Sequence, residues 1–155
     1  MDIRTAPRES CSVAAALEVV GERWTFLVLR EAFLGVRRFE DFRRNTGAAR
    51  NILSDRLNRL VANGILRRER YSDHPPRYEY RLTEKGLDLN PILVTLAAWG
   101  DKHGANAEPL FALEHRACGH RVTPVLTCPD CGEPVDDAHT LRLVLANPPV
   151  HGEAV

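Results

Sequence analysis

The sequence has no long hydrophobic run and no recognisable catalytic motif. No stretch of its 155 residues approaches the roughly 18 consecutive apolar residues that a membrane-spanning helix needs. Residues 1–12 lack the apolar core of a secretory signal, so we expect a cytoplasmic protein. The chain also lacks a glycine-rich phosphate loop, a His-Glu-x-x-His motif and a nucleophile elbow. These absences argue against common enzyme classes, and we predict that the protein is not an enzyme.

The chain has no excess of either charge. It contains 21 basic and 21 acidic residues, and a zero net charge taken alone argues against nucleic-acid binding. The charges are nevertheless segregated along the sequence. Residues 37–82 hold 12 arginines and 6 acidic residues and carry +6, whereas residues 1–36 carry −1 and residues 83–155 carry −5. Every basic residue of the central segment is arginine, which suits phosphate and guanine best, so the pattern favours DNA binding over a solvated helical face.

The central segment has the pattern of two helices separated by a turn. A short helix is expected over Phe39–Arg44, followed by a turn in which Thr46 or Gly47 lies near the next helix N-cap. A longer amphipathic helix is expected over Ala48–Asn63. Its apolar stripe consists of Leu53, Leu57, Leu60 and Val61.

Two segments of alternating character follow these helices. Ile65–Tyr71 and Arg77–Leu82 predict a β-hairpin, and the prolines between them should end the ladder and let residues 72–76 project as a wing. Helix, turn, helix and basic hairpin are the parts of a winged helix-turn-helix. The predicted fold class is therefore mainly α with a small β-hairpin wing, plus a small C-terminal β-rich unit.

The longer central helix presents short polar side chains opposite its apolar stripe. Such groups can hydrogen-bond to base edges and phosphates, although most helices have a polar solvent face. His74 and Arg77 in the wing could reach the minor groove or its phosphates, and an ordinary solvated loop is the alternative. The candidate DNA-contacting residues are Arg38, Arg43, Arg50, Asn51, Ser54, Asp55, Arg56, Asn58, His74 and Arg77.

Further helices are predicted on both sides of this motif. Cys11–Val20 and Trp24–Phe33 carry apolar residues at helical spacing. Thr83 suits the N-cap of another helix, which Pro91 either kinks or restarts. The apolar stripe over residues 92–103 is expected to form a dimer interface with the first helix, and burial inside one subunit is the alternative.

Three of the four cysteines lie in a C-terminal segment with a repeated spacing. Cys118 and Cys131 each follow a potential ligand, His115 or Cys128, by three residues, and each precedes a glycine. Such turns are typical of zinc knuckles, so we predict a zinc-ribbon-like unit with one structural Zn²⁺ on these four residues. His120 is an alternative fourth ligand. A pair of thiols without metal, free or as a disulfide, is the alternative to the zinc site.

The domain organisation predicted from composition has four parts. We expect a flexible arm over residues 1–10 and a DNA-binding and dimerisation domain over residues 11–104. Residues 105–109 read as a linker, residues 110–146 as the zinc-ribbon-like extension, and residues 147–155 as a loose tail. Residues 141–145 have an apolar, β-like composition.

Several short motifs within residues 11–100 occur in a specific order. They are Cys11, Gly21-Glu22-Arg23-Trp24-Thr25, Arg37-Arg38-Phe39, Leu53-Ser54-Asp55-Arg56-Leu57, Gly64, Pro76-Arg77-Tyr78-Glu79-Tyr80, Leu82-Thr83 and Trp99. This order resembles HxlR-type transcriptional regulators, a winged-helix group related to the MarR type. The resemblance implies a homodimer with one recognition helix per subunit in successive major grooves of a pseudo-palindromic operator. Residues 48–52 depart from the Ile-Ser-x-Arg start that relatives often carry, which leaves the operator sequence open.

Cys11 stands where some relatives of that family carry a cysteine that senses oxidants or electrophiles. A helix N-terminus at Cys11 would favour the thiolate, and a small packing residue is the alternative role. We therefore predict a sequence-specific regulator of transcription that binds double-stranded DNA as a homodimer and acts as a repressor. Its DNA binding is expected to respond to a small-molecule or oxidant effector. The alternatives are a thiol- or zinc-based redox-responsive regulator, or a redox protein that uses Cys128 and Cys131.

Overall fold

The computed structural model describes residues 11–104, 112–135 and 137–141. The elements are α1 (Ser12–Val20), α2 (Arg23–Phe33), α3 (Phe39–Thr46), α4 (Arg50–Ala62), β1 (Leu66–Asp73), β2 (Pro76–Leu82), α5 (Glu84–Leu87), α6 (Asn90–His103) and the 3-10 turn η3 (Ala138–Thr140). The predicted arm, linker and tail lie outside the described residues. No helix in the described ranges is long and apolar enough to cross a membrane.

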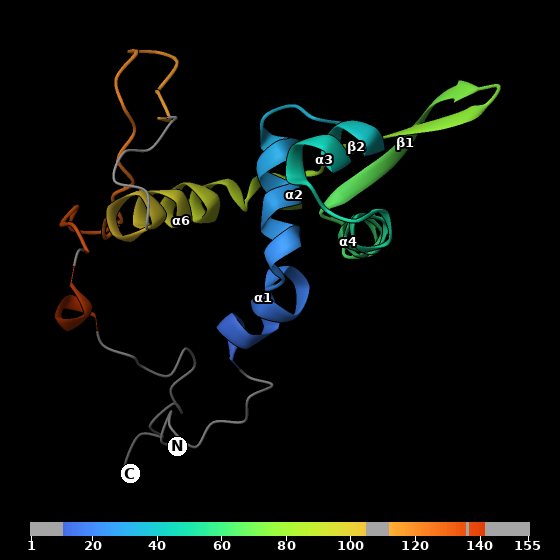
Figure 1. Ribbon diagram of the computed structural model, residues 1–155. Coiled ribbons are helices and arrows are strands. Elements are labelled where there is room, and N and C mark those ends of the chain that lie inside the picture. Colours follow the sequence, from blue (N-terminus) through green and yellow to red (C-terminus); the bar gives the residue numbers. More distant parts are fainter. Residues whose placement is uncertain (1–10, 105–111, 136, 142–155) are drawn as a thin grey trace, which may run out of the picture.

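Helix α2 lies at the centre of the fold. In Figure 1 α1 adjoins its lower end, α3, α4 and the wing lie along one side of it, and α6 lies on the other side. The core consists of Val20, Val28, Leu29, Phe42, Ala48, Leu53, Leu57, Leu60, Ile65, Leu66 and Tyr80. Three of the four residues predicted as the α4 stripe are fully buried, and Val61 packs partly buried against them. Burial of this stripe orients the opposite, polar face of α4 toward solvent.

The turn between α3 and α4 differs from the prediction in one detail. Gly47 has the left-handed conformation, with φ of 71°, that ends α3. The N-cap of α4 is Ala49, not Thr46 or Gly47, and no side chain caps this helix. The Thr46 hydroxyl instead donates to the Phe42 carbonyl at 2.7 Å and accepts from the Ala48 amide at 3.3 Å. Thr46 therefore closes the end of α3 rather than starting α4.

Strands β1 and β2 form a two-stranded antiparallel sheet that projects from the body of the fold (Figure 1). The ladder runs from Leu66↔Leu82 to Asp73↔Pro76, so the turn holds only His74 and Pro75. The prediction of a five-residue loop was wrong, because Pro76 is tolerated as the first residue of a strand. At the base of the wing, Arg38 forms an isolated bridge with Glu79.

The segment after the wing follows the predicted pattern. The Thr83 hydroxyl caps α5 by accepting from the Gly86 amide at 3.1 Å, and a new helix, α6, begins with Pro91 in its first turn. None of the described side chains of α6 is fully buried. Ile92 is 49% exposed, Leu96 47% and Trp99 63%. Leu93 packs partly buried against the core, so within the described residues the apolar stripe of α6 is only partly covered.

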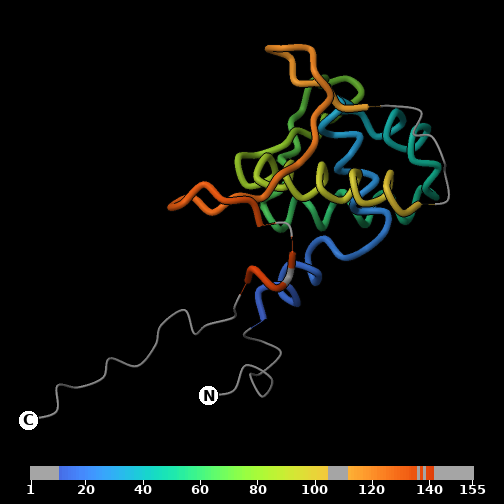
Figure 2. The backbone as a smooth tube through the Cα atoms, turned by 90° about the vertical axis from the view of Figure 1, so that its left-hand side faces the viewer, coloured from blue at the N-terminus to red at the C-terminus, as the bar shows by residue number. Residues whose placement is uncertain are grey.

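The C-terminal segment contains two tight turns in place of extended strands. Its described part holds two isolated β-bridges, Glu114↔Arg121 and Thr127↔Pro134. The two turns form separate protrusions in Figures 1 and 2. Most of the predicted β-like segment 141–145 lies outside the described residues, and Leu141 itself is exposed and not in a strand.

Candidate nucleic-acid interface

The solvent face of α4 is composed of short polar side chains. Asn51, Ser54, Asp55 and Asn58 are spaced three or four residues apart, so they share one face of the helix. Asn51, Asp55 and Asn58 are exposed and Ser54 is half-buried. Their amide, hydroxyl and carboxylate groups offer hydrogen-bond donors and acceptors of the kind that read base edges in a major groove.

Arginines and acidic residues are heavily paired around this face. Each of the six carboxylates within residues 37–82 forms an ion pair with at least one arginine of the same segment. Eight of the twelve arginines are engaged in this way. Arg37, Arg59, Arg68 and Arg77 have no ion-pair partner within the described part of the chain. These four side chains account for four of the six excess positive charges, and the other two belong to the eight arginines that share six carboxylates.

Three predicted phosphate-contacting arginines lie along α3 and the start of α4. Glu40 pairs with Arg43 at 2.9 Å and with Arg50 at 2.5 Å, and both arginines are exposed. The Arg50 guanidinium also lies 5.2 Å from the centre of the Phe39 ring. Arg38 pairs with Glu79 at 3.7 Å, at the base of the wing. All three guanidinium groups remain accessible despite these ion pairs.

Arg56 does not fit the expected role as a freely exposed phosphate contact. Only 16% of its side chain is exposed, and its Nη2 pairs with the Asp55 carboxylate at 2.7 Å. Its Nε is buried without a hydrogen-bond partner in the structure. Arg56 therefore orients Asp55 on the recognition face, and a direct contact to DNA would require its guanidinium to leave this position.

The wing carries exposed cationic groups along its length. His74 lies in the turn at its tip and Arg77 near the start of β2, and both side chains are exposed. Arg68 stacks on Tyr78 with its guanidinium 3.6 Å from the ring centre, and Arg70 pairs with Asp73 at 3.1 Å. Stacking of this kind holds a guanidinium in place without neutralising it.

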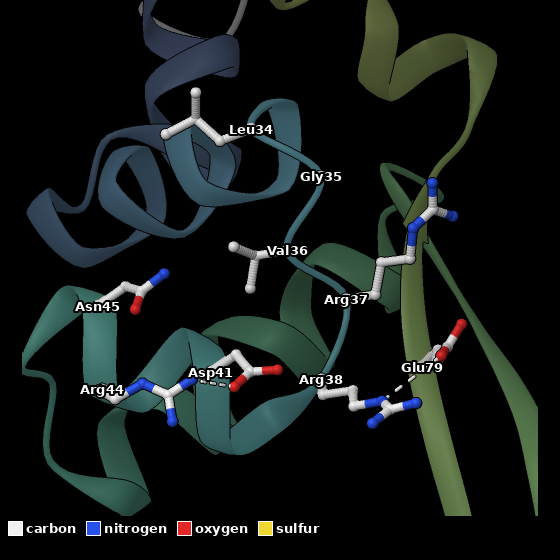
Figure 3. A pocket seen from close by; sticks show the side chains of 9 residues that line it. All are labelled: Leu34, Gly35, Val36, Arg37, Arg38, Asp41, Arg44, Asn45 and Glu79. Atoms are coloured by element: carbon white, nitrogen blue, oxygen red, sulfur yellow. Dashed lines mark hydrogen bonds and ion pairs between the residues drawn. The ribbon is translucent and has the colours of Figure 1, made fainter. Parts of the chain in front are cut away.

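Arg37, Arg59 and Arg68 were not among the DNA-contacting residues predicted from the sequence. Arg59 lies four residues after Asp55 and is exposed beside the polar face of α4, so helical spacing alone could have found it. Arg37 lines a shallow hollow of about 470 Å³ between α3 and the wing (Figure 3). In that view Arg38 points toward Glu79 and Arg44 toward Asp41, while Arg37 has no such partner.

Two carboxylates have lowered pKa values because of these ion pairs. Hydrogen bonding from Arg43, and then from Arg50, holds the pKa of Glu40 below its ordinary value of 4.5. A hydrogen bond from Arg67 and the nearby charge of Arg81 lower the pKa of Glu69 in the same way. Both groups are therefore charged at neutral pH, as their ion pairs with arginine require.

The structure brings the predicted zinc ligands together in pairs. His115 Nδ1 lies 3.3 Å from Cys118 Sγ. Hydrogen bonds from the backbone amides of Cys131 and Asp130, and then from the Cys131 side chain, lower the pKa of the Cys128 thiol. Within residues 11–104, 112–135 and 137–141, no three His, Cys, Asp or Glu side chains are grouped closely enough to hold one metal ion. The alternative ligand His120 is exposed.

Comparison with known proteins identifies the family of this fold. Residues 19–108 match the sequence profile of the HxlR-like helix-turn-helix family. The chain belongs to this family. It is 51% identical over 128 residues to the HTH-type transcriptional regulator Rv3095 of Mycobacterium tuberculosis, covering 82% of this chain and 81% of that one. It is 39% identical over 99 residues to an HTH-type transcriptional regulator of Methanothermobacter thermautotrophicus, covering 63% of this chain and 76% of that one.

Two solved structures share the architecture of this chain. The crystal structure of PA1607, a proposed transcription factor, matches with a TM-score of 0.77 and 37% identity, covering 87% of this chain and 94% of that one. The redox regulator HypR in its oxidised form matches with a TM-score of 0.57 and 36% identity, covering 60% of this chain and 97% of that one. The predicted winged helix-turn-helix fold and the family resemblance are thus confirmed.

Proposed function

We propose that this HxlR-type transcriptional regulator acts in the cytoplasm, where it binds duplex DNA with α4 in the major groove and the wing against the neighbouring minor groove. The observation that carries the proposal is the composition of the α4 face. Asn51, Ser54, Asp55 and Asn58 offer donors and acceptors to base edges. The elements before and after this helix in the chain, α3 and the wing, carry arginines that can bind phosphates.

The ion pairs around α4 are compatible with this role. Exposed pairs such as Arg43–Glu40 contribute little to stability because water screens them, so a phosphate can displace the carboxylate at small cost. No carboxylate has to be displaced from Arg59, Arg68 or Arg77, since these side chains have no ion-pair partner in the described ranges. DNA affinity should therefore depend strongly on salt concentration, as expected when arginines release counterions from the duplex.

The proposed functional unit is a homodimer formed by α1 and α6. Val13 and Leu17 on α1 are 66% and 55% exposed, although both belong to the apolar face of that helix. On α6, Ile92, Leu96 and Trp99 line an apolar surface groove. Large apolar side chains gathered on two helices favour contact with a second copy of the chain. Such a dimer would present two copies of α4 to half-sites about 34 Å apart on a pseudo-palindromic operator.

The function is tested by fluorescence-anisotropy titration with duplex DNA from the region upstream of the gene. We expect binding that is at least about a thousandfold tighter than to a scrambled duplex, and that weakens steeply with salt. Equal affinity for both duplexes, or affinity insensitive to salt, would contradict sequence-specific recognition. A promoter–reporter fusion then tests repression, which predicts higher reporter expression when the gene is deleted.

An oxidant-responsive mode of regulation is a second candidate, favoured by the position of Cys11. This thiol is free and exposed at the N-cap of α1, next to the proposed dimer surface. The similar protein HypR is a redox regulator. Hydrogen peroxide would oxidise the thiol to a sulfenic acid, which condenses with a second thiol. We expect peroxide to alter DNA affinity of the wild type but not of Cys11→Ser, and an equal response in both would exclude this role.

A further inference from the structure

The C-terminal segment contains the same ten-residue unit twice. Leu113–Val122 and Leu126–Val135 both read Leu-x-(His or Cys)-x-x-Cys-Gly-x-x-Val, with a shift of 13 residues. His115 corresponds to Cys128 and Cys118 to Cys131. The repeat includes the apolar residues at both ends of each unit, so it extends beyond the spacing of the cysteines.

The two units also have the same backbone hydrogen bonds. In the first unit they are Gly119 N to His115 O at 2.8 Å, His115 N to His120 O at 2.9 Å, and Val122 N to Leu113 O at 2.7 Å. In the second they are Gly132 N to Cys128 O at 2.9 Å, Cys128 N to Glu133 O at 2.9 Å, and Val135 N to Leu126 O at 2.7 Å. Each unit is therefore a small hairpin with a potential metal ligand before and after its turn.

Each turn has the shape that suits a metal ligand pair. Gly119 and Gly132 have φ of 69° and 74°, a left-handed conformation that lets the chain reverse directly after the second ligand. The matching backbone hydrogen bonds place Cys128 and Cys131 at the positions of the second turn that His115 and Cys118 occupy in the first. In the first turn, His115 Nδ1 and Cys118 Sγ are 3.3 Å apart, so both can face one ion. Two donors converge at the end of each hairpin.

The described part of the extension contains no fully buried apolar side chain. Leu113 is 48% exposed, Val125 66% and Leu126 67%, and none of the described side chains between residues 112 and 135 is fully buried. A segment of this size cannot stabilise a fixed arrangement of two hairpins by hydrophobic burial alone. A metal ion that joins them would supply the missing free energy.

We propose that the two hairpins bind one Zn²⁺ between them, with His115, Cys118, Cys128 and Cys131 as tetrahedral ligands. One nitrogen and three sulfur donors form a set that zinc prefers. Residues 123–125 join the hairpins and span at most about 14 Å from Val122 to Leu126, which keeps the two turns within reach of each other. Since the turns stand apart in Figures 1 and 2, zinc binding rotates one hairpin onto the other about this connection.

The internal repeat also decides between the two candidate histidines. In the repeat, His115 occupies the position of Cys128, whereas His120 occupies the position of Glu133. The carbonyl oxygens of His120 and Glu133 each accept a backbone hydrogen bond within their hairpin. His115 is thus the equivalent ligand. With four protein ligands the ion has no open position for water, so the site is structural rather than catalytic.

Metal analysis of the full chain tests this site. Protein purified in buffer with zinc and then dialysed should contain one zinc per chain by inductively coupled plasma mass spectrometry. Cys118→Ser and Cys131→Ser, one from each hairpin, should each lose the metal or bind it at least tenfold more weakly against a chelator. Cys11→Ser and His120→Ala are matched controls that should keep one zinc. Circular dichroism should show the helices of residues 11–104 unchanged in every variant.

Cobalt substitution examines the ligand set without mutation. Co²⁺ bound to the wild type should give the visible d–d bands of a tetrahedral site and the charge-transfer bands of thiolate ligands, and His115→Ala should lose the tetrahedral spectrum. Absence of zinc from the wild type would overturn the proposal. So would zinc that is retained in Cys118→Ser, zinc that is lost in His120→Ala but kept in His115→Ala, or a ratio of one zinc to two chains.

Discussion

Asn45 donates a hydrogen bond from Nδ2 to the Glu31 carboxylate at 2.7 Å and so ties the last turn of α3 to α2. The Glu31 residue is only 5% exposed. Arg30 completes the interaction by donating from Nε at 2.9 Å and from Nη2 at 2.7 Å to the other carboxylate oxygen. The turn before α4 is thereby fixed relative to the core. This contact sets the direction in which the polar face of α4 points.

Removal of this buried carboxylate should destabilise the domain. We expect Glu31→Ala to lower the free energy of unfolding by about 1–3 kcal/mol, because Asn45 and Arg30 lose their acceptor. Chemical denaturation measures the change. Glu18→Ala removes an exposed carboxylate on α1 and should change stability by less than about 0.5 kcal/mol. Equal stability of the two variants would show that the Glu31 interaction does not fix the turn.

Any side chain at Gly86 is predicted to destabilise the domain where α5 meets the base of the wing. A Cβ atom at this buried position would lie 2.3 Å from the Ile65 carbonyl oxygen and 3.0 Å from Leu82 Cδ2. Gly86→Ala should therefore cost about 1–3 kcal/mol, as overpacking does. Gly100→Ala on α6 meets nothing within 4 Å and should be neutral or stabilising by up to about 1 kcal/mol. Thermal unfolding compares the two, and a smaller loss for Gly86→Ala would refute the packing argument.

Glu40 is predicted to weaken DNA binding in the wild type. Its carboxylate holds Arg43 and Arg50, so Glu40→Gln should free both for phosphate and raise affinity several-fold at low salt. Because the pKa of Glu40 is lowered, its ion-pair contribution is fully present above the ordinary value of 4.5 and is lost only as pH falls through the lower folded value. The gain in DNA affinity from Glu40→Gln should thus be the same at about pH 6 and about pH 8.

Anisotropy titrations at both pH values measure this effect. Glu18→Gln removes an equal charge far from the basic segment and should leave the affinity nearly unchanged. An identical gain in both variants would indicate a general charge effect, and no gain in Glu40→Gln would mean that its arginines do not contact DNA.

The exposed apolar face of α6 is predicted to hold the dimer together. Leu96→Glu and Trp99→Glu each place a charge in the proposed interface and should shift sedimentation from dimer to monomer. Leu34→Glu alters a side chain that is 70% exposed between α2 and α3, and this variant should remain a dimer. Dimers that persist in both α6 variants would place the interface elsewhere.

The periodicity of apolar residues was sufficient to predict most of the domain. Leu53, Leu57 and Leu60 define the buried side of α4 by spacing alone, and the polar side follows from it. Thr83 and Pro91 were recognisable because N-caps and first-turn prolines are local features of sequence. These signals depend on neighbouring residues only.

The features of the site that could not be predicted from the sequence depend on side-chain rotamers and on contacts between elements. Arg56 looked like a free phosphate ligand, but its side chain folds onto Asp55 and is largely buried. Thr46 looked like an N-cap, but its hydroxyl bonds back to Phe42. The choice among twelve arginines also required the structure, since six carboxylates engage eight of them and leave Arg59, Arg68 and two others without an ion-pair partner in the described ranges.

The polar face of α4 is proposed to read base sequence. Its most direct test is the ratio of affinities for the upstream duplex and a scrambled duplex, measured in wild type and in the double variant Asn51→Ala/Asn58→Ala across a salt series. The ratio should fall toward one in the double variant, while the slope of affinity against salt stays unchanged because the arginines remain. An unchanged ratio, with or without weaker overall binding, would contradict readout by α4.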